Sequence, residues 1–361
     1  MKTTLICALT AMSAWVASGD FAKYIELTVG YSGASVSDFP TLVRLNSSRI
    51  DYADVKNGGA DIQFTDASGE TVYPHEVDTW NPDGESLVWV RLPQLASGAK
   101  FRMYYGDASV SVNTSATNVW TGYDLVCHVS GNANDSTANA RHGQLNPSGT
   151  TKSNGIVGQT HGMAAIDSGA AVIHPLYNWA SNQGEVLEDG QFSYSFWFRA
   201  NAEFVAWKNL AGPRNGADAD AWGIRSYNPT SKLGVRTARG AELVVATDGF
   251  AVGDWHKIDV TMNGTALAVY LDGASMGSST LSIAPKRCWV QSMGWGGACG
   301  SGTFGTTESL AVDVDECRIF STVADAARVA ADYATVANAN FLTYATPRDN
   351  VGEPGSALVL H

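Results

Sequence analysis

The sequence has few charged residues, and positive charge is the scarcest. Of 361 residues only 16% are charged, and 23 Lys and Arg stand against 35 Asp and Glu, which gives a formal net charge of −12. Long solvated helices need many more charged side chains, so the composition favours short strands joined by tight turns. Binding to a nucleic-acid backbone needs clustered Lys and Arg, and the sequence has no such cluster. Nucleic acid is therefore not an expected partner.

Long apolar runs are also missing, apart from one short stretch at the N-terminus. Residues 5–16 are mostly apolar, follow Lys2 and precede the small residues Ala17, Ser18 and Gly19. This order is typical of a secretory signal peptide, residues 1–19, with cleavage after Gly19. The run is too short to span a bilayer. We therefore expect an exported chain, periplasmic, cell-surface or secreted, with no membrane span after cleavage.

Cysteine is scarce, with five in the chain, and Cys7 lies within the expected signal peptide. The other four are Cys127, Cys288, Cys299 and Cys317. An even number in an oxidising compartment favours two disulfides. Zinc is the alternative for clustered cysteines, but no CxxC pair is present. Buried free thiols are a further alternative.

The first β-rich region covers residues 20–118 and ends in a stretch rich in Ser, Thr and Asn. Its short runs alternate apolar and polar residues, the pattern of a strand with one buried face. The predicted strands are Tyr24–Val29, Thr41–Leu45, Asp61–Thr65, Leu87–Leu92 and Phe101–Tyr105. About six short strands in about 100 residues predict an immunoglobulin-like β-sandwich.

The second region covers residues 119–342, and its clearest feature is a hairpin. Trp255–Met262 leads into Asn263-Gly264, the strongest two-residue hairpin signal, and Thr265–Leu271 leads out. With Asn263 and Gly264 as the loop, Val260 would face Leu267. This register leaves one face apolar and the other mostly polar.

Further elements follow along the second region. Asp272-Gly273 predicts a second tight turn, and Val312–Phe320 predicts a strand. Ala324–Ala337 is rich in alanine and predicts a short helix. Residues 343–361 are expected to form a C-terminal tail, with a loose stretch from Pro347 to Gly355. The fold class is therefore all-β with two sandwiches and one short helix.

Four stretches of the second region resemble the laminin-G-like, concanavalin A-type lectin family. They are Asp135–Gly143, Gln191–Arg199, Trp255–Gly273 and Val314–Phe320, in the family's order. The resemblance implies a jelly roll of two curved antiparallel sheets. The first region resembles a bacterial family known as domain of unknown function 2341. The stretches that carry this resemblance are 59–66, 76–81, 88–90 and 103–106.

The lectin-type resemblance also implies a structural calcium ion between the opening segment and the last strand. Asp135 and Asp315 would supply carboxylates, with backbone carbonyls around Asn139 and His142. Such a mixture of carboxylate and carbonyl oxygens suits Ca²⁺. The alternative is that Asp135 starts a turn and Asp315 is a solvated residue at a strand end.

In this family the first and last strands lie side by side, and this order implies a pairing of the cysteines. Cys127 falls in the expected first strand and Cys317 in the last, so the resemblance implies a Cys127–Cys317 disulfide. Cys288 and Cys299 would then pair locally and close a loop rich in Trp and Gly.

Tryptophans are the candidates for ligand binding, because an exposed indole ring can stack on the apolar face of a sugar. Trp207, Trp222 and Trp295 lie in loop-like surroundings, and packing of these loops is the alternative role. Trp89, Trp197 and Trp255 lie in predicted strands and are expected in the core. The polar residues that flank the preferred candidate, Trp222, are Asn215, Asp218, Asp220 and Arg225.

Two clusters of acidic residues could in principle be catalytic. Asp313 and Asp315 share one face of a predicted strand beside Glu316, but a glycosidase needs a carboxyl pair placed across a sugar, which this spacing does not provide. His75, Glu76 and Asp78 are expected on the surface of an edge strand. No catalytic residues are therefore assigned.

These observations favour a non-catalytic protein that binds a glycan or glycoprotein at the cell envelope. The alternative is a structural or adhesive component that binds a protein partner in an envelope or transport complex. A glycoside hydrolase is the third possibility, since the implied fold also hosts such enzymes. Exposed aromatic rings with convergent polar groups would favour the first, and a broad apolar patch the second.

Overall fold

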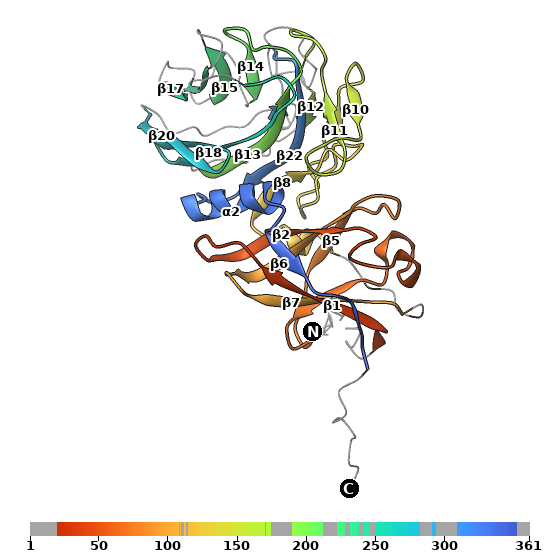
Figure 1. The fold of residues 1–361 in the computed structure, drawn as a ribbon. Helices are drawn as coiled ribbons and strands as arrows, with labels where there is room; N and C mark the ends of the chain where they lie inside the picture. Colours follow the sequence, from red (N-terminus) through yellow and green to blue (C-terminus); the bar gives the residue numbers. More distant parts are fainter. Residues whose placement is uncertain are drawn as a thin grey trace, which may run out of the picture.

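The structure is a computed structural model. It describes residues 20–107, 109, 112, 115–169, 171–174, 190–211, 222–227, 232–237, 242–245, 250–281, 291–293 and 309–351. Within these ranges the chain forms two β-sandwich domains with helix α2 between them (Figure 1). The all-β prediction is confirmed. The expected signal peptide lies outside the described residues.

The first domain is a sandwich of two antiparallel sheets. One has the strand order β23-β1-β7-β3-β4, and the other has the order β2-β6-β5. Alternation along β1 turns Ile25, Leu27 and Val29 into the core between the sheets. The strands are β1 (Lys23–Val29), β2 (Val36–Leu45), β3 (Gln63–Asp66), β4 (Val72–Tyr73), β5 (His75–Thr79), β6 (Ser86–Leu95) and β7 (Lys100–Tyr105), with 3-10 turns at Tyr52–Asp54 and Asn57–Gly59.

The C-terminal segment completes this first domain, so the expected tail is partly strand, and the prediction of a loose stretch from Pro347 is wrong for Arg348 and Asp349. Strands β23 (Leu342–Tyr344) and β24 (Arg348–Asp349) both pair antiparallel with β1, and Figure 1 shows the segment running beside it. The Tyr344 hydroxyl accepts a hydrogen bond from the backbone N–H of Arg44 at 3.0 Å. Strands of two or three residues are too short to show a period in the sequence.

The second domain is a jelly roll of two antiparallel sheets. The larger has the order β10-β11-β22-β13-β18-β19-β20 with β8 beside β22, and the other has the order β17-β16-β15-β14-β21-β12-β9. The larger sheet faces α2 and the first domain (Figure 1). Helix α1 (Ala116–Val119) leads into the strands β8 (Tyr123–Cys127), β9 (Gln144–Leu145), β10 (Thr150–Lys152), β11 (Thr160–Gly162), β12 (Val172–His174), β13 (Gln191–Ala200), β14 (Asn209–Ala211), β15 (Trp222–Tyr227), β16 (Lys232–Thr237), β17 (Glu242–Val245), β18 (Trp255–Asn263), β19 (Ala266–Leu271), β20 (Ala274–Thr280), β21 (Gln291–Met293) and β22 (Val312–Phe320).

The predicted hairpin exists, but its register differs from the prediction by two residues. Val260 faces Val269 rather than Leu267, because the loop is Gly264-Thr265 and not Asn263-Gly264. Gly264 has φ 61, and a hairpin turn with glycine at its first loop position meets this requirement without strain. A shift by two residues keeps every side chain on its predicted face.

Helix α2 (Ala326–Ala337) joins the two domains. Asp325 caps it by accepting a hydrogen bond from the Arg328 N–H at 2.8 Å. Toward the first domain, Thr335 Oγ1 accepts from the Leu42 N–H at 3.0 Å. Toward the second, the Tyr333 ring stacks on Trp197 with 5.3 Å between ring centroids. The helix is therefore an interface element as well as a C-terminal one.

An apolar cluster continues through the interface between the domains. Trp89 of the first domain packs against Trp120 of the second, with 5.4 Å between ring centroids. Both side chains are at most 1% exposed. The other buried members are Leu42, Leu87, Val119, Tyr123, Val126, Val157, Trp197 and Val336. The expectation that Trp89 and Trp197 are core residues is confirmed.

Cys127 and Cys317 face one another across strands β8 and β22, as predicted, but both are free thiols. The predicted Cys127–Cys317 disulfide is therefore absent. Both side chains lie fully buried in the jelly-roll core, where a thiol packs as a small apolar group. Cys288 and Cys299 lie outside the described residues.

Native protein should protect both of these thiols from alkylation. Burial raises the pKa of Cys317 to about 12 and also raises that of Cys127, so neither is a reactive thiolate near neutral pH. Alkylation followed by peptide mass mapping should label Cys127 and Cys317 after denaturation without reductant and leave them unlabelled before it. A cross-linked Cys127–Cys317 peptide would contradict the free-thiol state.

Candidate functional site

The interface side of strand β22 carries a β-bulge. Trp197 of β13 pairs with Asp315 and Ser195 pairs with Arg318, so β22 has one extra residue in this interval. Glu316 has φ 50, an uncommon backbone conformation for a residue other than glycine. The bulge interrupts strict alternation and places consecutive acidic residues, Asp315 and Glu316, in the strand.

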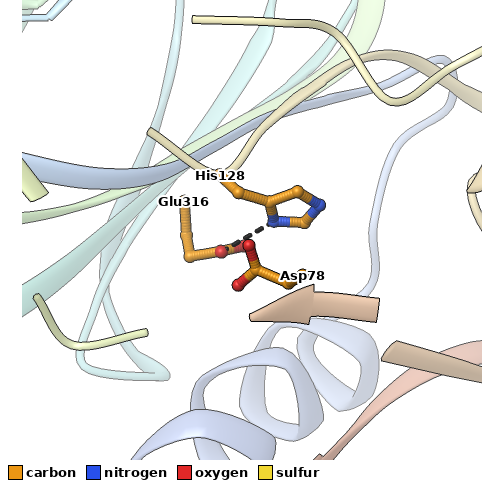
Figure 2. Close-up of side chains that lie close together, drawn as sticks. All are labelled: Asp78, His128 and Glu316. Atoms are coloured by element: carbon orange, nitrogen blue, oxygen red, sulfur yellow. Dashed lines mark hydrogen bonds and ion pairs between the residues drawn. The ribbon is translucent and has the colours of Figure 1, made fainter. Parts of the chain in front are cut away.

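The first domain contributes a second bulge opposite the first. Val77 pairs with Val88 and Thr79 with Leu87, so Asp78 is the extra residue of β5. Figure 2 shows the Asp78 and Glu316 carboxyl groups meeting beside the His128 ring. We call Glu76, Asp78, His128, Asp315, Glu316 and Arg318 the interdomain cluster.

His128 follows strand β8 and bridges two carboxylates. Its Nδ1 lies 2.8 Å from Glu316 Oε1, and its Nε2 lies 3.3 Å from Glu76 Oε2. Glu76 also accepts hydrogen bonds from Trp120 Nε1 at 2.5 Å and from Ser136 Oγ at 2.7 Å. One carboxylate comes from each domain, so the ring is held between the domains.

Arg318 is the main cation of the cluster and is only 3% exposed. Its guanidinium donates to Glu316 Oε2 and to Asp332 Oδ1, each at 2.6 Å. It also lies 4.3 Å from the ring centroid of Trp89 and 4.8 Å from that of Trp120. Two charged hydrogen bonds and two cation–π contacts therefore compensate a buried charge.

Lys257 extends this network along β18. Its Nζ forms an ion pair with Asp259, and a second one with Asp332 Oδ2 at 2.9 Å. Asp332 thus links Lys257 and Arg318 from helix α2. Three elements that are distant in the sequence meet in one buried chain of charges.

Burial and neighbouring charges set the protonation of this network. Burial lowers the pKa of His128, because it disfavours the imidazolium. The Glu316 and Glu76 carboxylates have a larger, opposite effect and hold this pKa well above its ordinary value. Burial raises the pKa of Asp78 to about 6, and burial together with Glu316 raises the pKa of Asp315. Burial therefore raises the pKa of Asp78 and Asp315, while the neighbouring carboxylates keep His128 a cation.

Asp332 should make stability depend on pH in acid. Burial opposes ionisation of Asp332, but Lys257 and Arg318 outweigh it and lower its pKa to about 2, below the unfolded value of 3.8. Its stabilising contribution is thus fully present above pH 4 and is lost as the pH falls through 2. Urea unfolding should show Asp332→Asn less stable than wild type by about 2 kcal/mol at pH 5. A difference that does not shrink between pH 4 and 2.5 would contradict this assignment.

The residues predicted to hold calcium have hydrogen-bond partners within the protein. Asp135 Oδ1 accepts from the N–H groups of Val126 (3.1 Å) and Thr137 (2.9 Å), while Oδ2 accepts from Thr137 Oγ1 (2.9 Å) and the Arg141 N–H (2.8 Å). Four donors fill the lone-pair positions of this carboxylate, so Asp135 fixes its own loop.

The other predicted calcium ligands also have hydrogen-bond partners in the protein. His142 Nδ1 accepts from the Asp135 N–H at 3.1 Å, and the Asn139 side chain donates to the Asp124 carbonyl. Asp315 is fully buried and accepts from the Val157 N–H at 3.1 Å, which corrects the solvated alternative. Calcium binding itself stays a prediction.

Trp222 is not an exposed ligand contact, which corrects the preferred candidate. It begins strand β15, is 1% exposed and packs against Phe192 and Tyr194, with ring centroids 5.6 and 5.4 Å away. Strand alternation turns it inward with Ile224. The remaining candidates of that loop, Asn215, Asp218 and Asp220, and also Trp295, lie outside the described residues.

Trp207 is the exposed candidate. It lies in the loop between β13 and β14, is 53% exposed and has φ 67. Positive φ in a bulky residue is a strained outlier, and such strain is concentrated at binding sites. The Arg225 guanidinium lies 4.9 Å from the centroid of the Trp207 ring. Because Trp222 and Ile224 point inward, Arg225 points to the outer face of its sheet.

The backbone under Trp207 is fixed by strand β15. The Trp207 N–H donates to the Ser226 carbonyl at 3.1 Å, and the Ser226 N–H donates to the Lys208 carbonyl at 2.8 Å. Lys208 Nζ forms an ion pair with Asp167 at 2.6 Å. We call Trp207, Arg225, Lys208 and Asp167 the tryptophan platform: an exposed indole beside the Arg225 guanidinium, with the Lys208–Asp167 ion pair at the next residue.

Comparison with known families agrees with this architecture. Residues 177–330 match the concanavalin A-like lectin/glucanases superfamily. The second domain is concanavalin A-like. Residues 58–137, which include the second half of the first domain and the start of the second domain, match the family described as domain of unknown function (DUF2341). Both resemblances seen in the sequence are therefore confirmed, in the same order.

Solved structures of low sequence identity resemble part of this chain. The binding domain of Paraclostridial Mosquitocidal Protein 1 has a TM-score of 0.46 at 13% identity, over 60% of this chain and 53% of that one. Domain 4 of AbnA, a GH43 extracellular arabinanase from Geobacillus stearothermophilus, has a TM-score of 0.44 at 14% identity, over 59% and 98%. The botulinum neurotoxin serotype D binding domain gives 0.43 at 14% identity, over 59% and 51%.

The chain spans about half the length of the toxin binding domains that it matches. No curated protein matches it. None of the helices in the described ranges is long and apolar enough to cross a membrane.

The sequence does not reveal the interdomain cluster. The prediction placed His75, Glu76 and Asp78 on a solvated surface, but His75 is 2% exposed and packs on Phe64, while Glu76 and Asp78 enter the interface. The usable signal was the pair of adjacent acids, Asp315 and Glu316, which breaks the alternation of an otherwise regular strand. No sequence pattern could show that β5 would cover it.

Proposed function

We propose that the protein is an exported, non-catalytic carbohydrate-binding protein whose saccharide site is the tryptophan platform on the concanavalin A-like domain. The observation that carries this proposal is Trp207, half exposed and held at positive φ beside Arg225. An indole face covers the apolar C–H face of a pyranose, and the Arg225, Lys208 and Asp167 groups can bond its hydroxyls.

The acidic residues support binding over hydrolysis. Asp313, on the strand considered for a glycosidase, is fully buried and held by Lys152 at 2.7 Å and Arg199 at 2.6 Å. Asp315 and Glu316 are also fully buried, under the first domain. A carboxyl pair for glycoside hydrolysis must flank the sugar, and these three side chains are closed to it.

A protein partner is the second candidate, and two exposed valines favour it. Val205 is 37% exposed and Val252 is 53% exposed, on loops that meet through the Phe204 and Phe250 rings, 5.3 Å apart. Together with Trp207 they add apolar surface of the kind that protein interfaces use.

A glycan array of the mature full-length chain tests the first proposal. Binding to a defined glycan class by wild type, with loss in Trp207→Ala, is the expected result. A blank array with well-folded protein would contradict saccharide binding and favour the protein partner. Release of reducing sugar from an array-positive glycan would instead contradict a non-catalytic role.

A further inference from the structure

We propose that Asp78, His128 and Glu316 form a site for a divalent transition-metal ion of the zinc class, which clamps the two domains together. Each of the three residues offers one ligand atom, and these atoms lie within 4.8 Å of one another. Asp78 comes from the first domain, while His128 and Glu316 come from the second. This ligand set shares no residue with the predicted calcium site.

The three side chains converge on one point. His128 Nδ1 and Glu316 Oε1 are 2.8 Å apart, and Figure 2 shows the Asp78 carboxyl on the same side of the ring. Zinc bonds of about 2.1 Å hold four ligands roughly 3.4 Å apart, so small side-chain rotations close the site. One imidazole and two carboxylates suit zinc better than calcium, which takes oxygen ligands alone.

Each of the three ligands already has an outer partner. His128 Nε2 faces Glu76 Oε2 at 3.3 Å, the carboxylate–histidine arrangement that orients a ligating imidazole. Arg318 donates to Glu316 Oε2 at 2.6 Å, and Ser130 Oγ donates to Asp78 Oδ1 at 2.8 Å. These contacts leave one atom of each ligand directed inward.

Two carboxylate oxygens of the interdomain cluster make no hydrogen bond within the described part of the chain. They are Asp78 Oδ2 and Asp315 Oδ1, and Asp315 is fully buried. The electrostatic neighbours of the Asp315 carboxyl are Glu316, Asp78 and His128. A buried oxygen without a partner is costly, and a cation held by Asp78, His128 and Glu316 would give Asp78 Oδ2 one and place positive charge beside Asp315.

Formal charge also favours a cation. The interdomain cluster holds the carboxyls of Glu76, Asp78, Asp315 and Glu316, against the cations His128 and Arg318, and Arg318 is shared with Asp332. A dication would balance the excess of carboxylates. When the metal binds, the Nδ1 proton of His128 is released to solvent, and the Nε2–H group keeps its hydrogen bond to Glu76.

Titration of the tag-free full chain with Zn²⁺, followed by calorimetry, tests this site. We expect one Zn²⁺ per chain, binding at least tenfold weaker in Asp78→Asn and a higher melting temperature with zinc than with chelator. Asp38→Asn is the control, because Asp38 pairs with Arg91 on the surface and its side chain is 62% exposed. That variant should bind zinc as wild type does.

The zinc absorption edge of the wild-type complex provides a test without any variant. One imidazole nitrogen with carboxylate oxygens in the first shell, and an anomalous peak between the domains, are expected. No zinc binding by the folded chain, equal binding in Asp78→Asn, or a peak elsewhere would each overturn the proposal. The glycan array reads a different surface, so the two proposals can fail independently.

Discussion

Replacing Arg318 with methionine should lower the free energy of unfolding by about 3–5 kcal/mol, because it leaves buried acids without their cation. Arg318 donates to Glu316 and Asp332 at 2.6 Å each, and both acids are at most 8% exposed. Methionine keeps much of the volume beside Trp89 and Trp120, so the lost charge rather than a cavity dominates the effect.

Arg91→Met is the matched control for this measurement. Arg91 forms an ion pair with Asp38 at 2.8 Å, but the Asp38 side chain is 62% exposed, so the loss should stay within about 1 kcal/mol. Urea unfolding of both variants at pH 7 gives the two values. Equal effects would mean that the buried network contributes no more than a surface pair, which would contradict its role in joining the domains.

Trp207→Ala should weaken saccharide binding by about thirtyfold, the loss typical of a central aromatic contact of about 2 kcal/mol. The substitution removes the stacking surface and the partner of the Arg225 guanidinium, 4.9 Å away. It should leave the melting temperature nearly unchanged, because the ring is 53% exposed and contributes little to the core.

Trp222→Ala separates the two roles of tryptophan in this domain. Its ring is 1% exposed, so its removal should cost about 3–5 kcal/mol of stability through the cavity left behind. At a temperature where both variants are folded, Trp222→Ala should retain binding and Trp207→Ala should lose it. The reverse pattern would return the site to the loop around Trp222.

The parts of the fold that the sequence predicted are those with local patterns. Alternation identified β1, β6 and β7, and the turn at Asp272-Gly273 connects β19 with β20 as expected, with positive φ at both residues. The family's strand order predicted that Cys127 and Cys317 are cross-strand neighbours, and they are. The disulfide expected between them is absent, because both are free thiols. Fold class therefore depended on patterns within single strands and hairpins.

The candidate sites could not be predicted in the same way, because they depend on contacts between distant segments. Whether Trp207 or Trp222 is exposed depends on which one begins a strand and faces the core, and both occur in similar local sequence. The bulges at Asp78 and Glu316 change the direction of side chains through the register between strands. The first domain's cover over β22 is a tertiary contact with no local signature.

The central claim, that the saccharide binds at the tryptophan platform, is tested most directly by NMR of the tryptophan indole N–H groups during titration with an array-positive glycan. The account predicts that the Trp207 signal shifts in a saturable way, while the signals of the buried Trp89, Trp120, Trp197 and Trp222 stay in place. A saturable shift confined to other tryptophans, with Trp207 unchanged, would contradict it.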